Sequence, residues 1–208
     1  MPAATTHIFR EGLLDMTALI TAACLAAAAL VVPCTGVSTH SATAAPAPAP
    51  RELPVTLQTA TGAIEGTLTL PAQDVGPYPV TLIIAGSGPT DRDGNSPAGV
   101  RTDAYKLVAD SLAARGIATL RYDKRGIAAS RAAGRSEADL RFDNYVDDAD
   151  GWIAQLRADK RFTTVTVIGH SEGSLIGMIA ARAAHADAYV SLEGAGSPAA
   201  AILRIQLK

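Results

Sequence analysis

The chain contains few cysteines and few histidines. Its 208 residues include two cysteines, Cys24 and Cys34, and four histidines. Both cysteines precede Ala44, so a chain cleaved after that residue has no thiol. The absence of thiols excludes disulfides, cysteine catalysis and thiolate metal sites, and we expect no metal site. The scarcity of histidine matters more, because it limits which residues could act as a general base.

Charge of one sign does not accumulate along the chain. The sequence has 18 basic and 20 acidic residues and a formal net charge of -2. The two signs are interspersed, and neither forms a block long enough to serve as an interaction tail. We therefore expect no nucleic-acid partner.

The N-terminal region has the composition of an export signal. Residues 17–32 are uncharged and apolar, and Ala42-Thr43-Ala44 fits the small-x-small rule for cleavage. We assign residues 1–44 to a signal peptide and residues 45–52 to a Pro/Ala-rich linker, which predicts an exported, periplasmic or secreted protein. An apolar stretch of about 16 residues is shorter than the roughly 20 that span a bilayer, so no stable span is expected after cleavage. An N-terminal membrane anchor is the alternative.

The strand pattern changes character along the remaining chain. Leu53–Thr59 and Ala63–Leu70 are β-prone runs joined through Gly62, which predicts an antiparallel hairpin. Four later runs are almost continuously apolar, as in parallel strands that are buried on both faces. They are residues 80–85, 117–120, 165–168 and 188–192.

Helical patterns separate these buried runs. The first predicted helix has its N-cap at Thr102 and places Ala104, Leu107, Val108, Ser111 and Leu112 on its buried face. The second buries Val146, Ala149, Ile153 and Leu156, and the third, which follows Ser171, is apolar on most sides. Alternating strands and helices predict an α/β fold, a mostly parallel doubly wound sheet preceded by the hairpin.

The segment Gly169-His170-Ser171-Glu172-Gly173 follows one apolar strand and opens an apolar helix. A G-x-S-x-G sequence in that context is typical of a nucleophile elbow, in which small residues flank a serine on a tight turn. The start of the helix adds a positive dipole end near the hydroxyl. Ser171 is therefore the candidate catalytic nucleophile; the alternative is an ordinary glycine-rich turn between strand and helix.

A second glycine-rich loop, Gly86-Ser87-Gly88-Pro89, follows the first buried strand. In acyl-transfer enzymes of this architecture, such a loop and the residue after the nucleophile donate backbone N–H groups to an oxyanion. The candidate oxyanion donors are Ser87 and Glu172. A dinucleotide loop is the alternative, but its sixth position is Asp91 and Pro89 lacks an N–H for phosphate, so no cofactor is expected.

Three motifs in this order resemble the bacterial α/β-hydrolase family that contains serine esterases and serine aminopeptidase-like hydrolases. They are residues 86–94, residues 122–130 and residues 169–173, and the resemblance covers roughly residues 53–200. It implies a hydrolase of carboxylic esters or related acyl substrates, which acts on small molecules through an acyl-enzyme on Ser171. The chain departs from the family pattern at Ala128, where glycine is usual. Asp123 and Arg125 either fix this loop or form a solvated charge pair.

The resemblance also implies an acid and a histidine placed after Ser171. His185 is expected about 21 Å away at the far end of a helix, and His170 is expected to direct its side chain away from the hydroxyl. Glu193 is at a position that some relatives use for the acid, although we favour a role in ordering the loop at residues 194–196. We therefore expect residues 53–208 to be the N-terminal part of an α/β-hydrolase domain, truncated before its last strands, with the catalytic histidine beyond residue 208.

Several functional alternatives remain open at this point. The 208 residues alone are expected to be inactive, whereas a longer form would be an esterase, a serine aminopeptidase or a thioesterase. A non-catalytic ligand-binding domain is a second class, and a partner chain that donates the histidine is a third. Acyl and leaving-group specificity and the oligomeric state are not indicated by the sequence.

Overall fold

The structure is a computed structural model that describes residues 49–73, 76–134 and 136–207. The predicted signal peptide and residues 45–48 of the predicted linker lie outside these residues. Within the described part of the chain, no helix combines the length and apolar character needed to cross a membrane.

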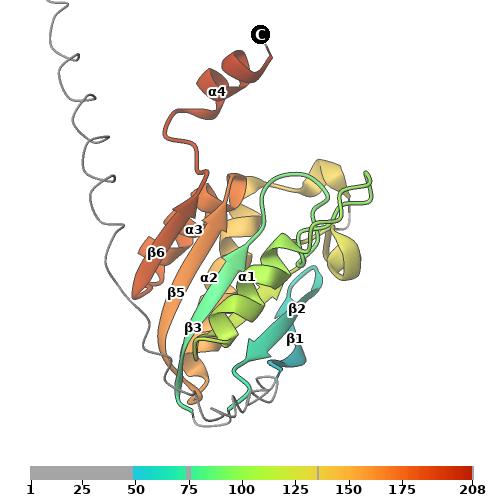
Figure 1. The fold of residues 1–208 in the computed structure, drawn as a ribbon. Helices are drawn as coiled ribbons and strands as arrows, with labels where there is room; N and C mark the ends of the chain where they lie inside the picture. Colours follow the sequence, from blue (N-terminus) through green and yellow to red (C-terminus); the bar gives the residue numbers. More distant parts are fainter. Residues whose placement is uncertain (1–48, 74–75, 135, 208) are drawn as a thin grey trace, which may run out of the picture. The chain divides into compact units, whose positions relative to one another are not determined.

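Six strands form one mixed sheet (Figure 1). The spatial order is β1-β2-β4-β3-β5-β6, in which β2 is antiparallel to both of its neighbours, β1 and β4, and β4, β3, β5 and β6 are parallel. The predicted hairpin and the four predicted parallel strands are thereby confirmed. The strands are β1 (Arg51–Thr59), β2 (Gly62–Leu70), β3 (Tyr78–Ile84), β4 (Ala118–Tyr122), β5 (Phe162–His170) and β6 (Ala188–Leu192).

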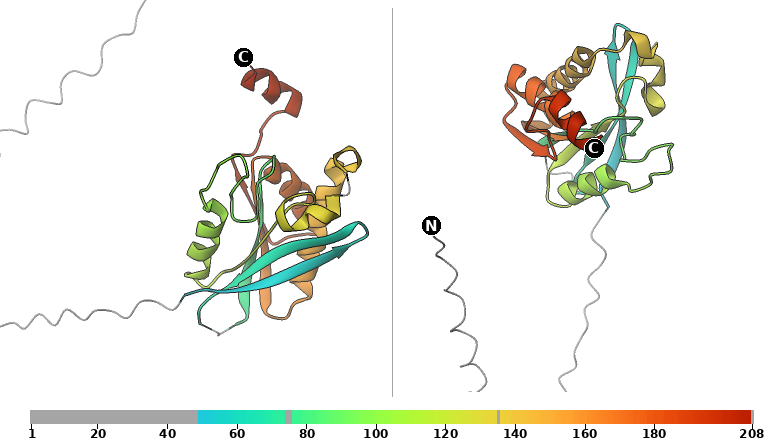
Figure 2. Two further views of the ribbon diagram at one scale, coloured as in Figure 1. Left: turned by 90° about the vertical axis from the view of Figure 1, so that its right-hand side faces the viewer. Right: turned by 90° about the horizontal axis from the view of Figure 1, so that it is seen from above.

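Helices cover both faces of this sheet. Helix α1 (Ala104–Ala113) lies on one face, and α2 (Phe142–Ala158) and α3 (Glu172–Ala183) lie on the other (Figure 2). Two short 3₁₀ helices, η1 (Ala128–Gly134) and η2 (Glu137–Asp139), connect β4 to α2, and α4 (Ala199–Gln206) follows β6. The arrangement is the doubly wound α/β sheet that the sequence predicts.

The main hydrophobic core lies between the sheet and helices α2 and α3. Leu82 and Ile84 of β3 are fully buried, as are Trp152 and Ile153 of α2 and Ile176 of α3. Removing such side chains from water is the largest favourable contribution to folding. It holds the carboxyl ends of β3 and β5, from which the candidate site is built.

Two burial predictions are wrong. Strand β6 is not buried on both faces: four of its five residues are exposed, which agrees instead with the uncovered apolar edge expected of a sheet truncated after this strand. Helix α3 is not buried all round, because Leu175, Met178 and Ile179 are exposed while Ile176 and Ala180 are buried. The reason is position: β6 is the edge strand of the described sheet, and α3 presents only one side to it.

The buried face of α1 also differs from the prediction. Its buried residues are Ala109 and Ala113, whereas Leu107, which was assigned to the buried face, is 59% exposed. The N-cap is Asp103 rather than the predicted Thr102. The Thr102 hydroxyl nevertheless accepts the N–H of Ala104 at 3.3 Å. Alanine is only weakly apolar, so the buried alanines contribute little to the apolar pattern of the sequence. The predicted buried face is therefore displaced by about one residue along the helix from the observed face.

Candidate active site

Ser171 occupies a tight turn between β5 and α3. Its backbone has φ 52° and ψ -118°, a conformation that residues other than glycine rarely adopt. A Cβ atom on Gly169 would lie 2.2 Å from the carbonyl oxygen of Gly173, and one on Gly173 would lie 2.3 Å from that of Ile84. Neither position can hold a side chain. The glycines therefore allow the turn, and Ser171 is left half-exposed at the carboxyl edge of the sheet.

The glycine-rich loop after β3 lies against this turn. Ile84 pairs with Gly169 across the parallel strands β3 and β5, so both strands end at the same level. A Cβ on Gly86 would lie 3.3 Å from the Cβ of Ser171. Gly86 is buried and Ser87 is exposed. The structure thus brings Ser87 and Glu172, the two candidate oxyanion donors, next to the candidate nucleophile.

A chain of polar side chains runs beside Ser171 on the side of α1. The Tyr105 hydroxyl accepts the N–H of Gly86 at 3.1 Å and lies 2.8 Å from Nδ1 of His170. The other ring nitrogen of His170, Nε2, lies 3.3 Å from Oε2 of Glu193. Burial raises the pKa of Tyr105, so this hydroxyl keeps its proton at neutral pH. Both nitrogens of His170 therefore have partners other than the Ser171 hydroxyl.

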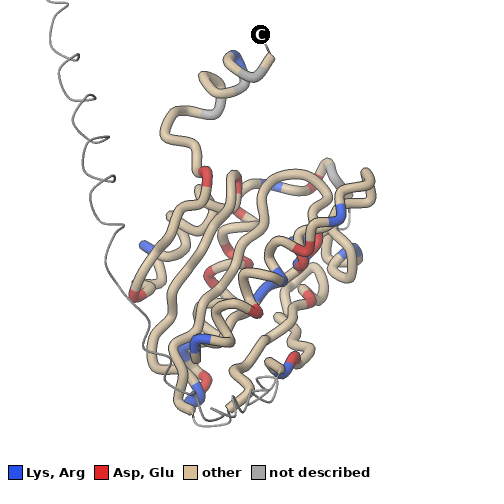
Figure 3. The backbone as a smooth tube through the Cα atoms, viewed as in Figure 1, with Lys and Arg blue, Asp and Glu red and all other residues tan. Residues whose placement is uncertain are grey.

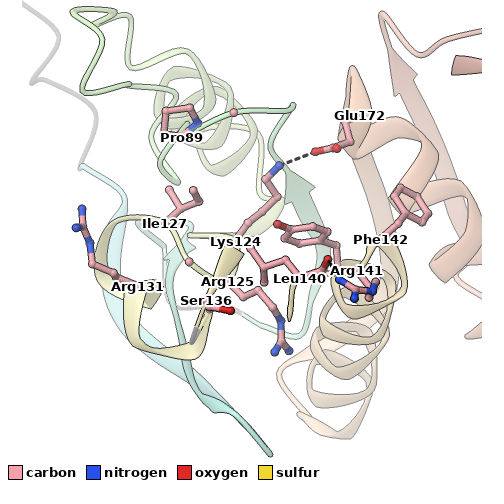
Figure 4. A pocket seen from close by; sticks show the side chains of 14 residues that line it. Pro89, Lys124, Arg125, Ile127, Arg131, Ser136, Leu140, Arg141, Phe142 and Glu172 are labelled. Carbon is pink, nitrogen blue, oxygen red and sulfur yellow. Dashed lines mark hydrogen bonds and ion pairs between the residues drawn. The ribbon is translucent and has the colours of Figure 1, made fainter. Parts of the chain in front are cut away.

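A buried lysine occupies the other side of the turn. The Lys124 ammonium group donates to the carbonyl oxygen of Gly86 at 2.7 Å and to Oε2 of Glu172 at 2.8 Å. Its side chain is only 4% exposed. Figure 4 shows the contact between Lys124 and Glu172 as a dashed line. Neither the role of Lys124 nor that of Tyr105 was found by the sequence analysis.

Asp123 and Arg125 are buried residues of the loop after β4, and they do not pair with each other. Asp123 accepts the backbone N–H groups of Arg92 at 2.8 Å and Ala129 at 3.0 Å. Arg125 forms a bidentate pair with Asp148 of α2. The interpretation as a solvated pair is therefore wrong, and both residues hold loops together.

Ala128 is the position at which the loop departs from the family pattern. It has φ 42°, in the left-handed region that glycine adopts without strain. The chain therefore keeps the backbone turn that the pattern requires although it carries a Cβ there.

The charged residues after the oxyanion loop have structural partners. Arg92 pairs with Asp123, and Asp93 pairs with Arg121, a residue of β4 that is 1% exposed. Asp91 accepts the backbone N–H groups of Asp93 and Asn95 through Oδ1. Figure 3 shows acidic and basic residues close together where these loops meet. These contacts fix the long connection between β3 and α1. In the sequence, they are indicated only by the alternating charges that follow the glycine-rich loop.

Two clefts flank the loop at residues 86–89. One, of about 710 Å³, is lined by the apolar residues Pro89, Ile127 and Leu140 together with charged residues that include Lys124, Arg125, Arg131, Arg141 and Glu172. The other, of about 410 Å³, is lined by residues that include Ser171, Ser87 and Val100. The oxyanion loop therefore contributes to both spaces, and Ser171 borders the smaller of them.

The described part of the chain contains two histidines, and neither is placed to take a proton from Ser171. His170 has the partners given above. His185 follows the last turn of α3, which begins at Glu172, about 21 Å of helical rise away from Ser171. Over the same residues, no cluster of His, Cys, Asp or Glu side chains could hold a metal ion.

Comparisons with known proteins agree on one group of enzymes. The family model for serine aminopeptidase, S33, matches residues 99–201. The esterase EstD of Thermotoga maritima is 28% identical over 145 residues, which cover 70% of this chain and 34% of EstD. The chain thus spans about a third of the length of that relative.

Solved structures show the same fold. XC6422 from Xanthomonas campestris, described as an a/b serine hydrolase without lid, matches with a TM-score of 0.53 and 23% identity over 68% of this chain and 60% of that one. GrgF, an α/β-hydrolase from Penicillium sp. sh18, matches with a TM-score of 0.57 and 18% identity over 76% and 53% of the two chains. The sheet of this chain, its turn at Ser171 and these similarities together show that the chain has the α/β-hydrolase fold and is similar to hydrolases and esterases of that family.

Proposed function

We propose that Ser171 is the nucleophile of a serine hydrolase that cleaves carboxylic esters or related acyl substrates. The observation that carries the proposal is the strained backbone of Ser171, held between two glycines that cannot bear side chains and next to the loop at Gly86. A strained residue at a sheet edge beside a cleft has no evident structural benefit, and such strain is concentrated at functional sites.

The proposed reaction uses backbone groups to stabilise charge. The Ser171 oxygen attacks the substrate carbonyl carbon, and the N–H groups of Ser87 and Glu172 donate to the oxygen that becomes negative. The start of α3 adds its positive dipole end. Expulsion of the alcohol leaves an ester of Ser171, and water then releases the acid. Each oxyanion donor of this kind contributes about 10²–10³ in kcat.

The general base is the part of the reaction that the described residues do not supply. A serine hydroxyl requires a base to become a strong nucleophile at neutral pH. Because His170 is engaged by Tyr105 and Glu193, His185 is distant, and His7 and His40 lie in the predicted signal peptide, we propose that the base is a histidine beyond residue 208. Residues 1–208 alone would then hydrolyse esters very slowly.

The two clefts support a small-molecule substrate. The larger cleft carries Ile127 and Leu140 among cationic side chains such as Arg131 and Arg141, and the smaller one borders Ser171 directly. The uncharged segment at residues 17–32 and the Ala42-Thr43-Ala44 sequence support export to the periplasm or the medium.

A fluorophosphonate probe, which modifies activated serines, tests the proposal. We expect slow labelling of the wild-type chain that is lost in Ser171→Ala. Ser87→Ala is the matched control, because it removes the other exposed hydroxyl of the site but keeps the backbone N–H. Labelling that survives Ser171→Ala, or that disappears only in Ser87→Ala, would contradict the proposal. Rapid ester turnover that depends on Ser171 would contradict the external base.

A non-catalytic ligand-binding domain is the second candidate, and the engagement of both His170 nitrogens favours it. It predicts binding of a neutral ester, measured by calorimetry, that is unchanged in Ser171→Ala and is accompanied by no probe labelling. The matched family model is that of serine aminopeptidase, so substrates other than simple esters also belong to the first proposal. Aminoacyl amides and thioesters are therefore assayed beside simple esters.

A further inference from the structure

Gly86 is held through both of its backbone groups. Its N–H donates to the Tyr105 hydroxyl at 3.1 Å, and its carbonyl oxygen accepts from the Lys124 ammonium group at 2.7 Å. The Gly86 carbonyl and the Ser87 N–H belong to the same trans peptide unit. Both bonds therefore lie in one plane and point in opposite directions. A group that fixes the carbonyl therefore also fixes the direction of the Ser87 N–H.

The two side chains that hold Gly86 also hold the residues on either side of Ser171. Tyr105 contacts His170, the residue before the nucleophile, at 2.8 Å. Lys124 contacts Glu172, the residue after it, at 2.8 Å. Two bridges thus connect one glycine of the oxyanion loop to both variable positions of the Gly-x-Ser-x-Gly sequence.

The first bridge determines the tautomer of His170. Because the Tyr105 oxygen already accepts the Gly86 N–H, its own proton is available for Nδ1 of His170. A neutral His170 then carries its proton on Nε2, which faces Glu193. With Nδ1 as an acceptor, the imidazole ring anchors Tyr105 to the turn.

The second bridge is a buried charge pair. Lys124 is 4% exposed and Glu172 is 34% exposed, and the ammonium group lies 5.3 Å from the centre of the Tyr145 ring. A buried ammonium group is costly unless it is paired and hydrogen-bonded, so Lys124 is confined to this geometry. Its charge also polarises the Gly86–Ser87 peptide, which strengthens the Ser87 N–H as a donor.

We propose that Lys124 and Tyr105 are positioning residues that hold the N–H groups of Ser87 and Glu172 at the separation needed to share one oxyanion. This inference rests on the proposed function of those two N–H groups. Because the Gly86 N–H is occupied by Tyr105, the geometry selects Ser87 as the donor from this loop. His170 and Glu172 serve as the anchors of the two bridges.

Nuclear magnetic resonance tests the bridges without requiring catalysis. In the wild type, the ¹⁵N shifts of His170 should show the proton on Nε2, and Tyr105→Phe should weaken this preference, which Glu193 alone would then support. The Gly86 amide should exchange about fivefold faster in Tyr105→Phe, because one hydrogen bond is lost. The Ser87 amide resonance should move in Lys124→Met. Tyr78→Phe and Lys106→Met are matched controls, since Tyr78 bonds at the opposite end of β3 and Lys106 pairs on the surface.

The rate of fluorophosphonate labelling tests the consequence for Ser171. Lys124→Met and Tyr105→Phe should each slow labelling by about tenfold or more, as expected for a displacement below 1 Å. The double variant should be no slower than the worse single variant, because both act through Gly86. Glu172→Gln keeps an acceptor for Lys124 and should recover most of the rate lost in Glu172→Ala.

These measurements separate the two proposals. If the wild type is not labelled, the proposed function fails, and the tautomer and exchange data still decide the positioning role. A His170 proton on Nδ1, or Gly86 and Ser87 amides that do not respond to the two substitutions, would overturn the positioning role. Labelling rates that are equal in the wild type and both single variants would also overturn it.

Discussion

At several single positions of the site, the backbone conformation or the lack of space for a side chain restricts which residue fits. Ser171 and Ala128 have positive φ values although neither is glycine. Gly169 and Gly173 have no room for a Cβ. The turn is therefore determined by sterics before any catalytic group is considered.

Gly173→Ala should disrupt the nucleophile turn. The added Cβ would lie 2.3 Å from the Ile84 carbonyl oxygen, so the helix start must move away from β3. We expect a loss of about 2–3 kcal/mol in the free energy of unfolding, typical of overpacking. Gly196→Ala is the control, because its Cβ would have no atom within 4 Å. Chemical denaturation measures both variants, and equal losses would contradict the steric argument.

Ala128→Gly should stabilise the protein. Residues with a Cβ pay roughly 1–2 kcal/mol in the left-handed region, and part of this is offset by the greater freedom of glycine in the unfolded chain. We expect a gain of about 1 kcal/mol, measured as a higher denaturation midpoint. Ala129→Gly, one residue later and without a positive φ, should instead lose about 0.5–1 kcal/mol. A loss in both variants would show that Ala128 is not strained.

At the scale of elements, ion pairs that each contain a buried arginine connect the loops around Ser171 to a helix and to a strand of the sheet. Arg125, in the loop after β4, is held by Asp148 of α2, and Arg121 of β4 is held by Asp93 of the loop after β3. The partners are 23 and 28 residues apart, so no local pattern in the sequence pairs them. These pairs set where the loops around Ser171 end.

Asp148→Ala should be strongly destabilising because it leaves Arg125 as a buried charge without its partner. The expected loss is about 3–5 kcal/mol, and the double variant Arg125→Met with Asp148→Leu should lose less than this single variant. Asp159→Ala is the control, since its pair with Arg161 is on the surface and contributes about 1 kcal/mol or less. The pairing argument would be contradicted if the double variant lost as much free energy of unfolding as the single variants Arg125→Met and Asp148→Leu lose together.

At the scale of the whole molecule, the described surface includes an apolar region at one edge of the sheet. Val190 and Leu192 of β6 and Met178 and Ile179 of α3 are all exposed. An edge strand with free backbone groups and apolar side chains is a site of association.

We therefore expect self-association of the chain that increases with concentration and that Val190→Lys reduces. A lysine on an edge strand opposes pairing through its charge. Val100→Lys is the control, because Val100 is also exposed but lies in the loop between β3 and α1. Sedimentation velocity measures the association. An unchanged distribution for Val190→Lys would show that this edge is not involved.

The sequence by itself determined the features that depend on neighbouring residues. Apolar runs indicated the parallel strands, Gly62 the hairpin, and Gly169 and Gly173 the turn at Ser171, because strand burial and tight turns follow from short stretches of chain. Only the tertiary structure decided which side of α1 faces the sheet, that α3 and β6 are partly exposed, and that Tyr105 and Lys124 hold Gly86. Those contacts join residues 19 and 38 positions apart, and they exist only once β3, β4 and α1 have packed together.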